Sequence, residues 1–99
     1  ILSGAHYSAK EAWEMGLVNK VVPHDRLMEE AKALARTIAS RSRVAVCAAM
    51  DAVMGGLEVS FEEGLLIEAE NFARVAVSQD AKEGLDAFLT KRKPDFRDR

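Results

Sequence analysis

A basic cluster near the C-terminal end of the sequence has the plainest chemical use. Lys91, Arg92 and Lys93 follow one another directly and precede Pro94. Three cations at a helix end can hold a phosphate, although the C-terminus of a helix itself repels anions. In the alternative interpretation they are solvated and complement the negative end of the helix dipole. The residues alone favour this alternative, so the cluster is a candidate phosphate site at most.

The histidines and the cysteine form no recognisable catalytic or metal-binding pattern. His6 and His24 lie far apart in the sequence, and Cys47 lies in an apolar segment where neither a metal nor an activating base is expected. We therefore predict no metal site, no catalytic residue among them, and a small core residue at Cys47. The sequence also has no Gly-x-Ser-x-Gly elbow and no phosphate-cradling glycine loop.

Acidic residues occur in three close pairs, which are Glu29 and Glu30, Glu62 and Glu63, and Glu68 and Glu70. General acid–base catalysis needs carboxylates held in an apolar pocket that shifts their pKa. Each pair lies early in a predicted helix or on a polar face, so we predict solvated carboxylates. Glu68 is the least certain of them, because it projects close to an apolar stripe.

Capping residues predict four helix starts. These are Ser-x-x-Glu capping boxes at 8–11 and 60–63, and the aspartates Asp25 and Asp80. Such side chains accept hydrogen bonds from the backbone N–H groups that the first turn of a helix leaves unpaired. Gly16 and the pair Gly55-Gly56 predict two helix ends. Between Gly16 and Pro23, the β-branched segment Leu17 to Val22 predicts one short strand.

The apolar pattern predicts that these helices need cover from other protein. One helix has an apolar stripe made by Leu27, Ala31, Leu34 and Ile38. From 44 to 54 nearly every residue is apolar, so protein should cover that helix on most sides. The next helix has a broad apolar face around Phe72 and a second one at Ile67 and Val75. Two faces indicate two packing partners, one of them in another subunit, or simply exposed apolar residues.

Length and composition predict a globular and mainly α-helical region. The chain has 99 residues, of which 48% are hydrophobic and 30% charged. It begins with Ile1 rather than Met, so we expect a piece of a longer protein or a processed product. A net charge of −2 argues against a nucleic-acid binder, and no apolar run approaches the roughly 20 residues that cross a membrane.

Several stretches together resemble the enoyl-CoA hydratase/isomerase (crotonase) family. They are Leu2 to Gly4, Ser8 to Ala12, Gly16 to Pro23, Glu58 to Gly64 and Asp80 to Phe96. Their order covers essentially the whole chain and is similar to the C-terminal region of that family. Met50 and Met54 replace a lysine and an asparagine that are frequent in enoyl-CoA hydratases, so the subfamily stays open.

The resemblance implies a parent with the spiral β-β-α crotonase fold, of which residues 1–99 form a single helical, oligomerising region. It implies an acyl-CoA thioester as substrate, coenzyme A as part of that substrate with no separate cofactor, and trimers or dimers of trimers. Hydration of a 2-enoyl-CoA in fatty-acid metabolism is the expected reaction, with isomerisation and other crotonase reactions as alternatives. The oxyanion amides and the two catalytic glutamates would lie upstream, and neither Glu62 nor Glu68 is taken as a substitute.

The resemblance also assigns two contacts with the coenzyme A held by a neighbouring subunit. Phe88 would approach the adenine and Lys91 the ribose phosphate, whereas Arg92 and Lys93 stay solvated or complement the helix dipole. A stand-alone helical interaction module without catalysis is the alternative from another class. We expect a cytoplasmic location, with an organellar matrix as the alternative.

Overall fold

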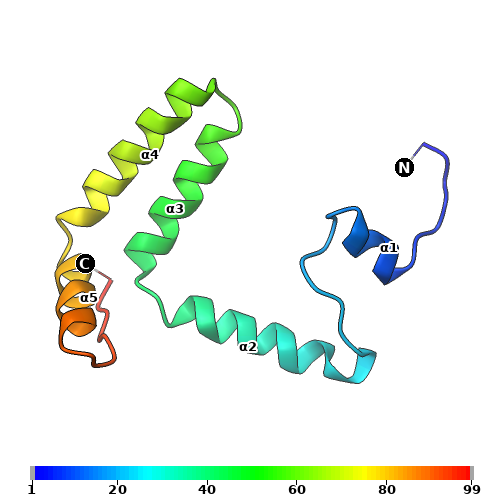
Figure 1. Ribbon diagram of the computed structural model, residues 1–99, viewed down its shortest axis with the longest axis horizontal. Coiled ribbons are helices and arrows are strands. Elements are labelled where there is room, and N and C mark those ends of the chain that lie inside the picture. Colours follow the sequence, from blue (N-terminus) through cyan, green and yellow to red (C-terminus); the bar gives the residue numbers. More distant parts are fainter. Residues whose placement is uncertain (1, 99) are drawn as a thin grey trace. The chain divides into compact units, whose positions relative to one another are not determined.

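The computed structural model describes residues 2–98. These residues contain helices joined by loops (Figure 1). It divides into two compact units, one up to Ala35 and one from Arg36 onward. The boundary between the units lies within a helix.

The first unit contains α1 (Ala9–Glu14), the short 3-10 helix η1 (His24–Arg26) and most of α2 (Leu27–Ala39). The predicted capping box is confirmed. Ser8 Oγ accepts a hydrogen bond from the Glu11 amide at 3.2 Å, and the Glu11 carboxylate accepts one from the Ser8 amide at 2.8 Å. These bonds lower the pKa of Glu11. Gly16 follows the helix with a φ of +75°, which confirms the predicted helix end.

Two predictions for this unit are wrong. Leu17 to Val22 forms no strand, and none occurs elsewhere in residues 2–98. A strand needs a neighbouring strand to pair its backbone groups, and the described chain supplies none to this segment. Asp25 does not start α2 either, because it lies inside η1, which Pro23 precedes.

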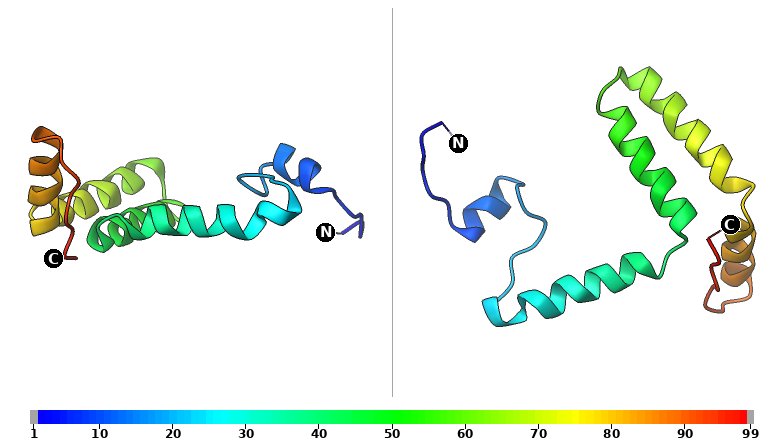
Figure 2. Two further views of the ribbon diagram at one scale, coloured as in Figure 1. Left: turned by 90° about the horizontal axis from the view of Figure 1, so that it is seen from below. Right: turned by 180° about the vertical axis from the view of Figure 1, so that it is seen from behind.

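The second unit is built around two helices that lie side by side, α3 (Arg43–Gly56) and α4 (Phe61–Ala76), as Figures 1 and 2 show. They approach closely at two glycines, since a Cβ on Gly64 would stand 3.6 Å from the Cα of Gly56. Arg74 on α4 also reaches Asp51 on α3 at 2.9 Å. The helix end predicted at Gly56 is confirmed.

The start of α4 also agrees with the sequence. Ser60 Oγ accepts a hydrogen bond from the Glu63 amide at 3.3 Å, and the Glu63 carboxylate accepts one from the Ser60 amide at 3.1 Å. The second predicted capping box is therefore confirmed, and it lowers the pKa of Glu63.

The last helix, α5 (Gln79–Leu89), begins two residues earlier than expected. Its cap is Ser78, whose Oγ accepts a hydrogen bond from the Ala81 amide at 3.0 Å. The prediction that Asp80 caps this helix is wrong, because the Asp80 carboxylate is engaged by the chain that follows the helix. That chain runs back along α5 to the C-terminus (Figure 2).

Little of the apolar surface is covered by the chain itself. Ala48 and Ala87 are the buried hydrophobic residues of the described chain. Met50, Val53 and Met54 on α3 stay exposed, so residues 2–98 do not provide the cover expected for that helix. Cys47 is exposed as well, and its prediction as a core residue is wrong. Within the second unit, α4 packs on only one side of α3, so the described chain leaves much of the α3 surface uncovered.

Candidate functional site

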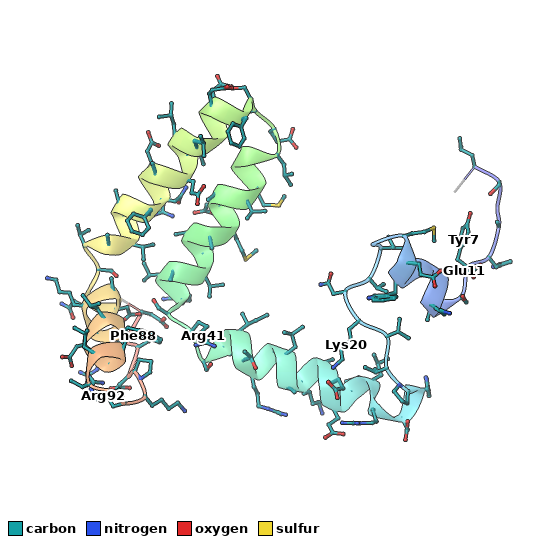
Figure 3. The ribbon with its side chains drawn as sticks, in the orientation of Figure 1. Tyr7, Glu11, Lys20, Arg41, Phe88 and Arg92 are labelled. Atoms are coloured by element: carbon teal, nitrogen blue, oxygen red, sulfur yellow. The ribbon has the colours of Figure 1, made fainter. Side chains whose placement is uncertain are left out.

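The C-terminal turn of α5 presents both residues that the sequence analysis singled out. Phe88 lies in the last turn of the helix with 79% of its surface exposed (Figure 3). Thr90 ends the helix, and Lys91 follows with a φ of +53°. The Arg92 amide then donates to the Ala87 carbonyl at 3.0 Å, and the Lys91 amide donates to the Phe88 carbonyl at 3.3 Å. This is a left-handed helix end of the kind usually made by glycine.

Arg92 is held by two carboxylates of the same helix. One guanidinium nitrogen lies 2.5 Å from Glu83 Oε1, and the other lies 2.8 Å from Glu83 Oε2. The second nitrogen also reaches Asp86 at 2.6 Å. A two-pronged arginine–carboxylate pair fixes direction as well as distance. Arg92 is therefore ion-paired to its own helix while its side chain stays partly exposed at the helix end.

Charge around Arg92 changes the acidity of its partners. The Arg92 hydrogen bonds and the Asp95 amide, which donates to Glu83 at 2.7 Å, hold the pKa of Glu83 at about 2. The two carboxylates in turn raise the pKa of Arg92. Within residues 2–98, Lys91 and Lys93 have no ion-pair partner. Of the three clustered cations, Arg92 is thus neutralised and the two lysines keep an uncompensated charge.

A buried aspartate ties down the rest of the tail. Asp80 is only 4% exposed, and its two oxygens accept the backbone amides of Arg97 at 2.9 Å and Asp98 at 3.0 Å. Asp98 accepts the amide of Arg43 at 2.7 Å, at the start of α3. Sequence reasoning missed this arrangement, because its partners are backbone groups 17 and 18 residues beyond Asp80.

A hollow lies between α3 and α4. It is an open groove of about 560 Å³. Its walls are mostly small and apolar side chains: Ala45, Ala48, Ala49, Ala52, Val53, Leu57, Phe61, Leu65, Phe72 and Val75. Of the described residues that line it, Glu68 carries the only carboxylate, while Asn71 donates to the Ile67 carbonyl at 2.9 Å. An apolar groove with one acid suits an apolar ligand or a covering helix, and a lone carboxylate does not make a catalytic pair.

Residues 2–98 contain neither a metal-binding cluster nor a membrane-spanning helix. No group of three or more His, Cys, Asp or Glu side chains in residues 2–98 could hold a metal ion. No helix in this part of the chain is both long enough and apolar enough to cross a bilayer.

Comparisons with known proteins agree with one another. A family profile described as Enoyl-CoA hydratase/isomerase matches residues 1–99. A probable enoyl-CoA hydratase of Rhizobium meliloti is 44% identical over 99 residues, which are 100% of this chain and 38% of that relative. The 2,3-dehydroadipyl-CoA hydratase of Escherichia coli is 40% identical over 99 residues, 100% of this chain and 39% of the relative.

Solved structures give the same result. The enoyl-CoA hydratase of Bacillus anthracis is similar with a TM-score of 0.96 and 39% identity, over 100% of this chain and 38% of that one. A crystal structure from Geobacillus kaustophilus, of an enoyl-CoA hydratase subunit, has a TM-score of 0.91 and 41% identity, over 98% and 38%. The chain spans well under half the length of the relatives it matches, and it corresponds to their C-terminal part.

Proposed function

The chain belongs to the enoyl-CoA hydratase/isomerase family, and on that premise we propose that it forms the C-terminal part of an enzyme acting on acyl-CoA thioesters. Hydration of a 2-enoyl-CoA is the proposed reaction, because the relatives described above carry hydratase names. The helical structure also agrees with the C-terminal region of that fold.

The proposed work of this segment is contact with coenzyme A, which is part of the substrate rather than a separate cofactor. The observation that carries this is the end of α5, where an exposed aromatic ring lies three residues from a lysine that has no ion-pair partner within residues 2–98. An exposed Phe88 ring offers a flat apolar surface to the adenine base, and the Lys91 ammonium offers a mobile positive charge to the ribose phosphate. Chemistry at the thioester would belong to residues outside this chain.

Assembly with other protein is the second proposed role. Phe61 and Phe72 on α4 and the stripe of Leu34 and Ile38 on α2 are at least half exposed. Exposed apolar residues that gather on one face of a helix mark surfaces that other protein covers, and this applies to each helix by itself. We propose that the remainder of a crotonase-like subunit and its symmetry copies, as a trimer or dimer of trimers, supply this cover. A cytoplasmic location, or an organellar matrix, is part of the same proposal.

The phosphate contact can be tested by titrating the chain with CoA and with 3′-dephospho-CoA in a calorimeter. A charged hydrogen bond contributes about 1.5 kcal/mol or more, so CoA should bind roughly tenfold more tightly. Lys91→Ala should remove most of this preference. Lys82→Ala, at an exposed lysine of α5 nine residues earlier, is the matched control and should retain it.

Equal loss of affinity for both ligands in Lys91→Ala would refute the assigned contact. Failure of the unaltered chain to bind either ligand would contradict a working CoA site on these helices and would leave the segment as a scaffold. Sedimentation equilibrium then tests the assembly role, which predicts species heavier than the 10.9 kDa monomer.

A further inference from the structure

The backbone conformation of Lys91 is unusual for the residue it carries. Its φ of +53° lies in the left-handed region, where a Cβ is disfavoured and glycine is the common choice. A lysine persists there only if the surrounding contacts impose the conformation. The contacts on both sides of Lys91 therefore decide where its side chain leaves the helix.

Hydrogen bonds close the turn from the helix side. The Thr90 amide donates to the Asp86 carbonyl at 2.9 Å, and the Thr90 hydroxyl donates to the same oxygen at 2.7 Å. The Arg92 amide reaches back five residues to the Ala87 carbonyl at 3.0 Å. Lys91 is thus the single residue through which the chain reverses between two anchored neighbours.

The Arg92 side chain also holds this turn against α5. Its guanidinium spans Glu83 and Asp86, which are three residues apart and so share one face of α5. The backbone amide of Asp95 is held by the same Glu83 carboxylate. The loop from Lys91 to Asp95 is consequently fixed to α5 at both of its ends.

From this geometry we propose that Arg92 is a positioning residue for Lys91. By pairing with Glu83 and Asp86, it holds Lys91 in the left-handed conformation and fixes the direction in which the lysine leaves the helix toward a ligand phosphate. This inference rests on the proposed CoA contact of Lys91 and adds the residue that organises it.

A direct role for Arg92 as a phosphate ligand fits the structure less well. Two carboxylates already occupy the donors of its guanidinium, and together they outweigh its single charge. An anion approaching Arg92 would meet acceptors and negative charge. The neighbouring Lys91 has no such partner in the described chain.

The test is a double-mutant cycle that reads the affinity ratio of CoA to 3′-dephospho-CoA. Arg92→Ala should lower this ratio toward one, as Lys91→Ala does. Because Arg92 acts through Lys91, the affinity ratio of the double variant should be no lower than that of Lys91→Ala alone. Additive losses would overturn the proposal in favour of a direct Arg92 contact.

A purely structural role for Arg92 gives a different result. In that case Arg92→Ala would weaken both ligands equally and leave the ratio unchanged, which also overturns the proposal. Arg74→Ala is the matched control, since it removes another arginine–carboxylate pair, with Asp51, far along the chain from Lys91. It should lower the thermal midpoint without changing the ratio. Arg92→Lys, which keeps the charge but loses the two-pronged geometry, should restore the ratio only in part.

A second measurement does not depend on any ligand. Backbone chemical shifts and the three-bond coupling of Lys91 report its φ in solution. Arg92→Ala should shift these values away from the left-handed region, and unchanged values would contradict the positioning role. If the unaltered chain shows no preference for CoA while Lys91 does respond to Arg92→Ala, the CoA proposal fails and the conformational coupling stands.

Discussion

The close approach of α3 and α4 can be tested by replacing one of the two glycines that face each other there, Gly56 and Gly64. A Cβ on Gly64 would lie 3.6 Å from the Cα of Gly56 and 3.8 Å from its carbonyl oxygen, which is ordinary van der Waals contact. Gly64 lies inside α4 and does not have a positive φ. We therefore expect Gly64→Ala to be accommodated without moving the helices, and to stabilise the chain.

The expected magnitude follows from the backbone. Glycine within a helix costs roughly 0.5–1 kcal/mol relative to alanine, chiefly because the unfolded chain has more freedom to lose. With no close contact to offset this gain, Gly64→Ala should raise the free energy of unfolding by about 1 kcal/mol. In a chain of this length that is a rise of about 4–8 °C in the thermal midpoint.

Gly55 provides the comparison. A Cβ at this position would stand 3.3 Å from Ile67 Cγ2, which is closer than side chains usually approach. The Ile67 side chain would have to shift, and this cost of overpacking offsets the helical gain. Gly55→Ala should therefore change stability much less than Gly64→Ala.

Urea unfolding followed by far-UV circular dichroism gives the free energy of unfolding of the unaltered chain, Gly64→Ala and Gly55→Ala under one condition. A clear loss of stability in Gly64→Ala would refute the reasoning, because it would mean that α3 and α4 lie closer than the structure shows. Equal gains in both variants would also count against it, since the contact with Ile67 would then have no effect. Gly64→Leu extends the series, and overpacking by its larger side chain should cost about 1–3 kcal/mol.

Three further changes test the caps and the tail. Ser60→Ala should lower the free energy of unfolding by about 1 kcal/mol with an unchanged urea slope, because one helix start loses its hydroxyl acceptor. The pKa of Glu83 is about 2 in the folded chain and near its ordinary 4.5 when unfolded, so the unfolded state binds more protons. Stability should therefore fall as the pH drops from about 4.5 to about 2, and Glu83→Gln should flatten that part of a plot of urea midpoint against pH. Asp80→Asn leaves one oxygen for two donors, so amide hydrogen exchange at Arg97 and Asp98 should accelerate, whereas unchanged rates would show that the tail is held by other contacts.

Helix ends were predictable because their determinants are local. The boxes at Ser8 and Ser60 and the glycine at 16 act within three or four residues of the backbone groups they serve, and the structure confirms each of them. Asp80 has the same local signature, yet its carboxylate binds amides 17 and 18 residues away, and Ser78 takes the capping position. A cap signal thus identifies a residue able to bind free amides without saying which amides it will bind.

Apolar periodicity predicted which helix faces need to be buried by other protein segments. It did not predict whether this chain itself provides those segments. The nearly all-apolar pattern of α3 led to the expectation that Cys47 is a core residue, whereas the described chain leaves it exposed. The strand expected at Leu17 to Val22 failed for a related reason, because its β-branched residues express a preference that only a neighbouring strand can satisfy. Both errors fall where residues 2–98 supply no packing or pairing partner for the segment.

The candidate site divides in the same way between local and distant determinants. The local pattern alone could not distinguish the three consecutive cations at 91–93, because all share one setting at a helix end, and the preference for Lys91 came from the family resemblance. The structure separates them through a left-handed turn that carries Arg92 back to carboxylates nine and six residues earlier, spacings that no continuous helix brings together. Once Arg92 is neutralised there, a phosphate would be attracted by Lys91 and Lys93 while the paired carboxylates repel it from the helix itself. The position of the phosphate would then depend on the conformation of Lys91, which makes the conformation of one residue in this turn as important to binding as its charge.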